Sequence, residues 1–121
     1  MKMDELKLYE SEYRFMDLIW EKEPIRSMDL AREAMRELGW KKSTCYTVLK
    51  KLGERGFVKN EEAVVHALVS REQVQKYESE ELLKKSFDNS LPAFLTSFLK
   101  DRKLSKDEAE EIMKMIEEAA R

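Results

Sequence analysis

Two short amphipathic segments meet at Gly39, and their spacing limits the folds that this chain can adopt. After Gly39, apolar residues recur at helical spacing and would pack one face of a helix inward, namely Cys45, Val48, Leu49 and Leu52. The segment before Gly39 has a matching stripe, made by Ala31, Ala34, Met35 and Leu38. About four residues that include a glycine separate the two helices, which is the spacing of a helix-turn-helix.

The outward face of the second of these helices is basic and rich in hydroxyl groups. The stretch from Trp40 to Lys51 contains four lysines and no carboxylate. Side chains of these kinds contact phosphates and base edges in DNA. We therefore expect DNA to be bound by Lys41, Lys42, Ser43, Thr44, Tyr46, Thr47, Lys50 and Lys51. A charged helix face that is only solvated is the alternative that this segment alone leaves open.

The first three helices have recognisable ends in the sequence. Ser11 is the expected N-cap of the first helix, which continues through Trp20. The second and third helices are expected to be capped by Ser27 and Ser43, and Gly39 is placed where a left-handed residue ends the second.

After Gly56 the helical period gives way to β-type residues. The runs at residues 57–58 and 63–69 flank the polar residues 59–62, a pattern that predicts a hairpin. Three helices followed by a hairpin indicate a mainly α fold with a small β-hairpin, a winged helix-turn-helix domain over residues 1–70. Glu61 and Glu62 occupy the expected tip and would repel phosphate, which leaves open whether this wing touches DNA or is only a connector.

Residues 71–121 are expected to form a separate helical region, with helices at 73–87, 91–99 and 105–119 and with Ser105 as the cap of the last. These helices carry many apolar side chains, which a segment of about 50 residues cannot bury within itself. Pairing with the same segment of a second chain is the simplest solution. Packing onto the N-terminal domain of the same chain is the alternative. The expected dimerisation residues are Leu83, Phe87, Leu91, Phe94, Leu95, Phe98, Leu99, Ile112 and Ile116.

Whole-chain properties limit the classes of function. The net charge of −2 over 121 residues argues against a protein that coats nucleic acid indiscriminately, so any DNA binding must be local. No apolar run approaches the roughly 20 residues of a membrane helix, and charged residues stand where a signal peptide would be apolar. We expect a soluble cytoplasmic protein with no membrane association.

The sequence holds no recognisable catalytic or metal-binding set. Cys45 is the single cysteine and falls on the inward stripe, so it is expected to be a core residue. His66 is the single histidine and has no second ligand at metal-binding spacing. We therefore expect no cofactor, no metal site and no enzymatic activity.

Four runs of residues resemble the penicillinase-repressor (BlaI/MecI/CopY) family, at 11–20, 42–52, 56–58 and 68–72. The resemblance continues more loosely through the C-terminal helices and so covers nearly the entire chain. It implies a bacterial winged-helix transcriptional repressor that binds a palindromic operator as a homodimer, with its C-terminal helices swapped or interlocked. It also implies that the DNA is faced by Lys42, Ser43, Thr44, Tyr46, Thr47 and Lys50.

Roles within this face can be assigned from side-chain chemistry. We expect Thr44 and Thr47 to meet base edges or a thymine methyl group, and we expect Lys42, Lys50 and Lys51 to meet phosphates. A protein-interaction module that uses the winged-helix scaffold without specific DNA binding is the alternative function, because the fold alone does not decide.

The chain departs from the family pattern in three places, the first of which is the wing, with Glu61 and Glu62 where relatives tend to carry basic or glycine residues. It has no cysteine after Cys45, whereas the copper-sensing branch carries a cysteine-rich C-terminal motif, so copper sensing is not expected. Resistance-linked members are inactivated by cleavage of an Asn-Phe bond under the control of a regulatory membrane protease. The corresponding pair here is Ser97-Phe98, which makes it the candidate cleavage site.

Overall fold

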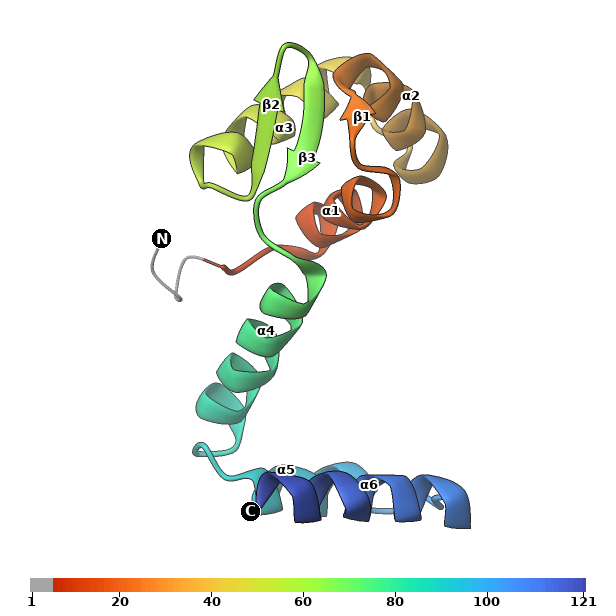
Figure 1. Ribbon diagram of the computed structural model, residues 1–121, viewed down its shortest axis with the longest axis vertical. Coiled ribbons are helices and arrows are strands. Elements are labelled where there is room, and N and C mark those ends of the chain that lie inside the picture. The colour runs from red at the N-terminus through yellow and green to blue at the C-terminus, as the bar shows by residue number, and fades with distance from the viewer. Residues whose placement is uncertain (1–5) are drawn as a thin grey trace. The chain divides into compact units, whose positions relative to one another are not determined.

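The computed structural model describes residues 6–121, shown in Figure 1. Along this part of the chain the elements follow the order α1, β1, α2, α3, β2, β3, α4, α5, α6. They form two compact units, the first ending at Glu81 and the second spanning Leu82–Arg121. A mainly helical fold with a small antiparallel sheet confirms the predicted fold class. No helix among the described residues is long and apolar enough to cross a membrane.

Helix α1 (Glu10–Lys22) begins one residue earlier than its predicted cap. Its N-cap is Tyr9, whose backbone N–H donates to the Glu12 carboxylate at 2.8 Å. This closes one half of a capping box around Tyr9 and leaves Ser11 inside the first turn. The prediction of Ser11 as the cap was therefore wrong, because the Glu12 side chain satisfies the Tyr9 N–H and Tyr9 is the N-cap from which the helix starts.

Helices α2 (Ser27–Leu38) and α3 (Lys42–Glu54) confirm the helix-turn-helix, although their N-caps are Arg26 and Lys41 and not the two predicted serines. Neither N-cap residue makes a side-chain capping hydrogen bond. Gly39 does end α2 in the left-handed region, at φ 71°. Its N–H donates to the carbonyl of Met35 at 3.1 Å, which satisfies one of the carbonyls left free at the end of the helix.

The sheet has three antiparallel strands in the order β1-β3-β2. Strands β2 (Val58–Glu61) and β3 (Val64–Ala67) form the predicted hairpin. Its turn is Glu62-Ala63, with both residues at positive φ (52° and 64°), so the tip is narrower than the predicted residues 59–62. The Ala63 carbonyl accepts a hydrogen bond from the Ser27 N–H at 2.9 Å, which fastens this turn to the start of α2.

The two-residue strand β1 (Ile25–Arg26) was not predicted. It pairs with β3, Ile25 opposite Val65 and Arg26 opposite Val64. In Figure 1 the sheet lies in front of α3, and α1 and α2 complete the enclosure of one core. The fully buried residues with the largest side chains are Phe15, Phe57, Met16, Ile19, Leu30, Leu52, Val58, Val65, Val74 and Cys45.

Cys45 lies inside this core, as predicted. Burial raises the pKa of its thiol to about 11, because a charged thiolate would lose its hydration there. The thiol is thus protonated at neutral pH and fills space as a small apolar side chain.

Helix α4 (Arg71–Ser86) contributes Val74 and Tyr77 to the core of the first unit. The second unit contains α5 (Leu91–Leu99) and α6 (Lys106–Ala119). Ser90 caps α5, since its hydroxyl oxygen accepts from the Ala93 N–H at 3.1 Å. Ser105 caps α6 as predicted, since its hydroxyl oxygen accepts from the Glu108 N–H at 3.1 Å. In contrast to the first unit, no residue from Leu82 to Arg121 is buried.

Candidate nucleic-acid interface

Helix α3 exposes every residue predicted to contact DNA. Three inward residues, Cys45, Leu49 and Leu52, fasten the helix to the core. All eight predicted residues, from Lys41 to Lys51, are exposed on the remaining surface, with Lys41 at the N-cap. We call this surface the α3 face. Its residues therefore meet the steric requirement for entering a major groove, while the DNA contacts themselves stay a prediction.

Helical spacing places Ser43, Thr47, Lys50 and Glu54 in one row along the middle of the α3 face. Thr44 and Lys51 lie to one side of this row, and Tyr46 lies to the other. Glu54 was not singled out from the sequence, and it gives the C-terminal end of the row a negative charge. We therefore expect favourable contacts with DNA on the first three turns of α3.

The two threonines of the α3 face differ in their hydrogen bonding. The Thr47 hydroxyl donates to the Ser43 carbonyl at 2.9 Å, a bond within the helix. Among the described residues, the Thr44 hydroxyl has no such partner. The sequence alone predicted the same roles for both residues, so this difference is information that only the structure supplies.

Strand β2 adds polar residues beside the α3 face. Lys59 and Asn60 are exposed and line an open hollow of about 490 Å³ together with Tyr46 and Lys50 of α3. The sequence placed both residues in a hairpin but gave no signal that they lie next to α3. They extend the basic and polar surface from the helix onto the sheet.

The acidic residues of the wing are not equivalent. Glu61 lies at the end of β2, and its carboxylate pairs with the Lys59 ammonium at 2.7 Å. The hydrogen bond and the charge of Lys59 lower the pKa of Glu61, so this carboxylate is ionised and locally compensated. Glu62 is exposed in the turn, and no ion pair is found for it among the described residues. The uncompensated negative charge of the wing thus lies at Glu62.

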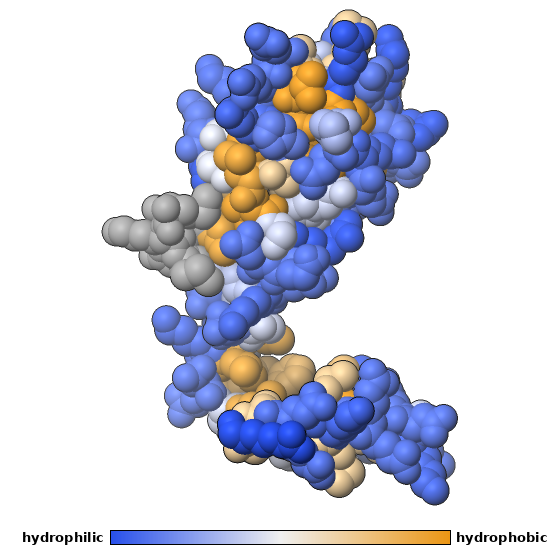
Figure 2. All heavy atoms as spheres, in the orientation of Figure 1, coloured by the Kyte–Doolittle hydropathy of each residue, from blue (hydrophilic) through white to orange (hydrophobic). Residues whose placement is uncertain are grey.

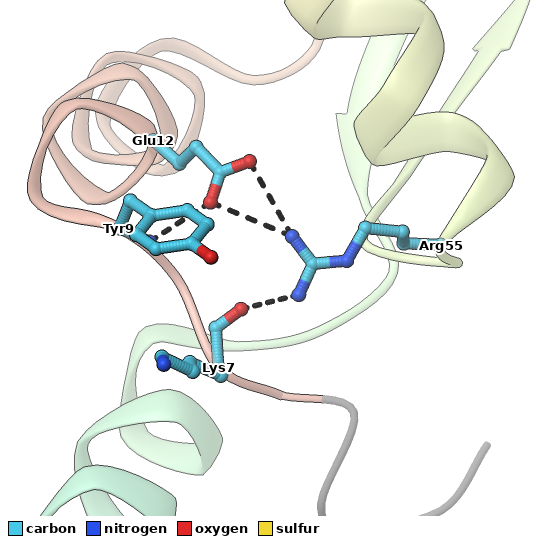
Figure 3. A network of polar contacts seen from close by, with 4 residues as sticks. All are labelled: Lys7, Tyr9, Glu12 and Arg55. Carbon is cyan, nitrogen blue, oxygen red and sulfur yellow. Dashed lines mark hydrogen bonds and ion pairs between the residues drawn. The ribbon is translucent and has the colours of Figure 1, made fainter.

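Both ends of α3 are fixed by contacts with residues distant in the sequence. Before its N-terminus, the Trp40 ring stacks on Phe15 of α1, with ring centroids 5.0 Å apart. After its C-terminus, Arg55 reaches the segment that precedes α1, as Figure 3 shows. Its guanidinium donates to the Glu12 carboxylate at 3.4 Å and to the Lys7 carbonyl. These contacts hold the α3 face in a fixed position on the first unit.

We expect Arg55→Met to lower the free energy of unfolding by about 1–2 kcal/mol, because the largely covered Glu12 carboxylate and the Lys7 carbonyl lose a charged donor. Arg32→Met is the matched control, since Arg32 pairs with Asp29 on the open surface of α2 and should change stability little. Urea unfolding of both variants measures the difference. Equal costs would show that the Arg55 contacts do not stabilise the fold.

The predicted dimerisation residues lie on the second unit, where they form what we call the C-terminal apolar face. Phe94 contacts both Phe87 and Phe98, with ring centroids 5.3 and 5.5 Å apart. Four of the nine predicted residues are exposed, and the other five are half-buried. Figure 2 shows hydrophobic side chains reaching the surface of this unit. Exposed apolar residues beyond the predicted nine are Leu82, Leu104, Met113 and Met115.

The candidate cleavage pair, Ser97 and Phe98, lies inside α5 and is exposed. A protease binds its substrate in an extended conformation, so this turn of α5 would have to unfold locally before cleavage.

Helices α1, α2 and α3 pack with the three-stranded antiparallel sheet around one core, and α2 and α3 form a helix-turn-helix. This arrangement defines the first unit as a winged-helix domain of the kind that binds DNA. The chain belongs to the penicillinase repressor family, whose sequence model matches residues 8–118. This confirms the resemblance recognised in the sequence.

The individual relatives have low sequence identity to this chain. The methicillin resistance regulatory protein MecI of Staphylococcus aureus strain Mu50 is 24% identical over 117 residues, which cover 91% of this chain and 95% of that protein. The protein of the same name from Mammaliicoccus sciuri is 23% identical with the same coverage. These relatives are named as regulators, not as enzymes.

Proposed function

We propose that this protein represses transcription by binding a palindromic DNA operator as a homodimer. The observation that carries the proposal is the α3 face, on which eight basic, hydroxyl or aromatic residues are all exposed on a helix fixed at both ends. Membership of the penicillinase repressor family and similarity to MecI support the repressor role.

The second unit supports the dimer. Helix α5 is apolar along most of its nine residues, yet no residue of the unit is buried in a single chain. An exposed apolar surface of this kind marks an interaction site. A second copy of the same unit offers an equally apolar surface, and isologous pairing would cover both. We propose that the C-terminal apolar face forms this homodimer interface.

A symmetric dimer presents two α3 faces to two half-sites related by a two-fold axis. The half-sites are then about one helical turn of DNA, or a multiple of it, apart. Repression follows from occlusion, because the bound dimer occupies DNA that polymerase needs. Cleavage between Ser97 and Phe98 by a regulatory membrane protease would cut the dimer interface and so release the operator without touching the α3 face.

Selection of bound sequences from a random duplex library, at about 150 mM salt to screen weak surface attraction, tests the proposal. We expect enrichment of a palindrome. If no sequence is enriched and binding disappears as salt rises, the protein is not a sequence-specific repressor, and a protein-interaction module becomes the better description.

We expect Glu62→Lys to raise affinity for operator and unrelated DNA alike by about two- to fivefold, if the wing tip lies near the phosphate backbone. Glu62 is the uncompensated charge of the wing, so the substitution removes a repulsion and adds an attraction. Glu110→Lys, on the exposed surface of α6, is the control for the change in net charge. Titrations at two salt concentrations measure the effect, and equal gains for both variants would show that the wing is remote from DNA.

A further inference from the structure

We propose that Thr47 recognises the C5 methyl group of a pyrimidine through its own γ-methyl group, which selects thymine over cytosine at one position of each half-site. This inference rests on the proposed function and specifies how the α3 face reads sequence.

Thr47 has a central place on the α3 face. It lies in the middle row, one turn after Ser43 and one turn before Lys50, and its side chain is exposed. A residue at the centre of such a row is the one that a major groove would bring nearest to the base edges, while Lys51, to one side of the row, is nearer to the phosphates.

The donor of the Thr47 hydroxyl is already used. The O–H group donates to the Ser43 carbonyl at 2.9 Å, so its proton faces the preceding turn of α3 and only the acceptor capacity of the oxygen is left. A threonine Cβ carries only a hydroxyl and a methyl group, and the staggered position taken by the hydroxyl is closed to the methyl. Of the two groups on Cβ, the methyl group is thus the one that makes no bond within the helix, and on this exposed residue it is the group that we expect to meet DNA.

Within the major groove, a methyl group discriminates among bases because thymine alone presents one, at C5. Apolar contact between two methyl groups removes both from water and is lost when either is absent. The same contact would be made to 5-methylcytosine, which carries the same group at the same position. Beside its methyl group thymine presents only an acceptor, O4, to which the committed Thr47 hydroxyl cannot donate, so Thr47 is expected to sense the methyl group of this base.

Thr44 provides an internal contrast. Its hydroxyl has no hydrogen-bond partner among the described residues, so it can still donate to a base edge or a phosphate. Two threonines three positions apart on one helix are thus set up for different tasks, and substitutions can separate them.

The test measures the affinity of the full-length protein for the selected operator and for operators in which each thymine in turn is replaced by deoxyuridine, which lacks only the methyl group. We expect one thymine per half-site to show a loss of about three- to fivefold, the value of one methyl contact. A second operator carries cytosine in place of this thymine. Replacing that cytosine by 5-methylcytosine should recover the affinity.

Variants of Thr47 then assign the effect. Thr47→Val keeps the methyl group and should keep the ratio of thymine to deoxyuridine affinity, whereas Thr47→Ser keeps the hydroxyl and should bring that ratio to about one. Thr44→Ser is the control and should leave the ratio unchanged whatever it does to affinity. Thermal unfolding of each variant shows that the comparison is between folded proteins.

Three results would overturn the inference: a wild-type protein indifferent to deoxyuridine at every position, a Thr47→Val variant that loses the discrimination, or a Thr47→Ser variant that retains it. Each of these can occur with a palindromic operator still bound, so they are distinct from failure of the proposed function. Failure of that function is the enrichment of no sequence at all.

Discussion

A chain with Phe94→Asp and Phe98→Asp is expected to be monomeric and to bind the operator at least about a hundredfold more weakly. Both rings belong to the C-terminal apolar face, and Phe98 is 41% exposed in a single chain. Pairing of two chains would bury four added carboxylates, which is unfavourable unless each finds a partner. Without pairing, the second α3 face no longer benefits from the effective concentration that the dimer provides.

Sedimentation equilibrium at micromolar concentration and an operator titration measure the two effects. Thr96→Asp is the matched control, because it adds a charge to the exposed opposite side of the same helix and should leave the protein dimeric. Circular dichroism of the double variant reports whether α5 and α6 stay helical. A double variant that remains dimeric would show that the interface lies elsewhere.

The second large effect is expected in the core. Phe15→Ala should lower the free energy of unfolding of the first unit by about 3–5 kcal/mol, a substantial part of the stability of a small domain. Phe15 is fully buried and stacks on Trp40, which directly precedes α3. The cost has two parts, the lost free energy of transferring the ring from water into the core and the penalty for the cavity that remains.

Phe15→Leu is the control and should cost much less, because it keeps most of the apolar volume. Urea unfolding followed by the fluorescence of Trp20 and Trp40 measures both variants. Operator affinity of Phe15→Ala, measured where the variant is still folded, should also fall, since Trp40 loses the ring that supports it. A cost of about 1 kcal/mol or less for Phe15→Ala would contradict the described core.

Helical periodicity was sufficient to predict the helix-turn-helix and the exposed side of α3, because both depend on residues close together in the sequence. The ends of α1, α2 and α3 were predicted less well. Ser11 looked like a cap, but Glu12 supplies the acceptor that fixes the start of α1 at Tyr9. Such choices depend on which of several neighbouring polar side chains bonds the backbone.

The features that sequence reasoning missed are long-range. Strand β1 has two residues, too few for a pattern, and it exists because Ile25 pairs with Val65. The turn at Glu62-Ala63 contains no typical turn former and is fastened by Ser27. Likewise, nothing in the sequence indicated that Arg55 reaches Lys7 and Glu12.

The candidate site was predicted as a set of residues but not in its internal organisation. Composition identified the eight residues of the α3 face, and all of them are exposed. It could not show that Thr47 uses its hydroxyl within the helix, nor that Lys59 and Asn60 lie beside Tyr46. Hydrogen bonding and the packing of a strand against a helix are decided by three-dimensional geometry, which a single sequence does not display.

The mass of the complex between the wild-type protein and its selected operator, determined by sedimentation or native mass spectrometry at about 150 mM salt, tests the central claim most directly. The proposed repressor predicts two chains on one palindromic duplex and no stable complex with a single half-site. One chain bound per duplex, with equal affinity for a half-site and for the whole operator, would contradict the dimeric mechanism.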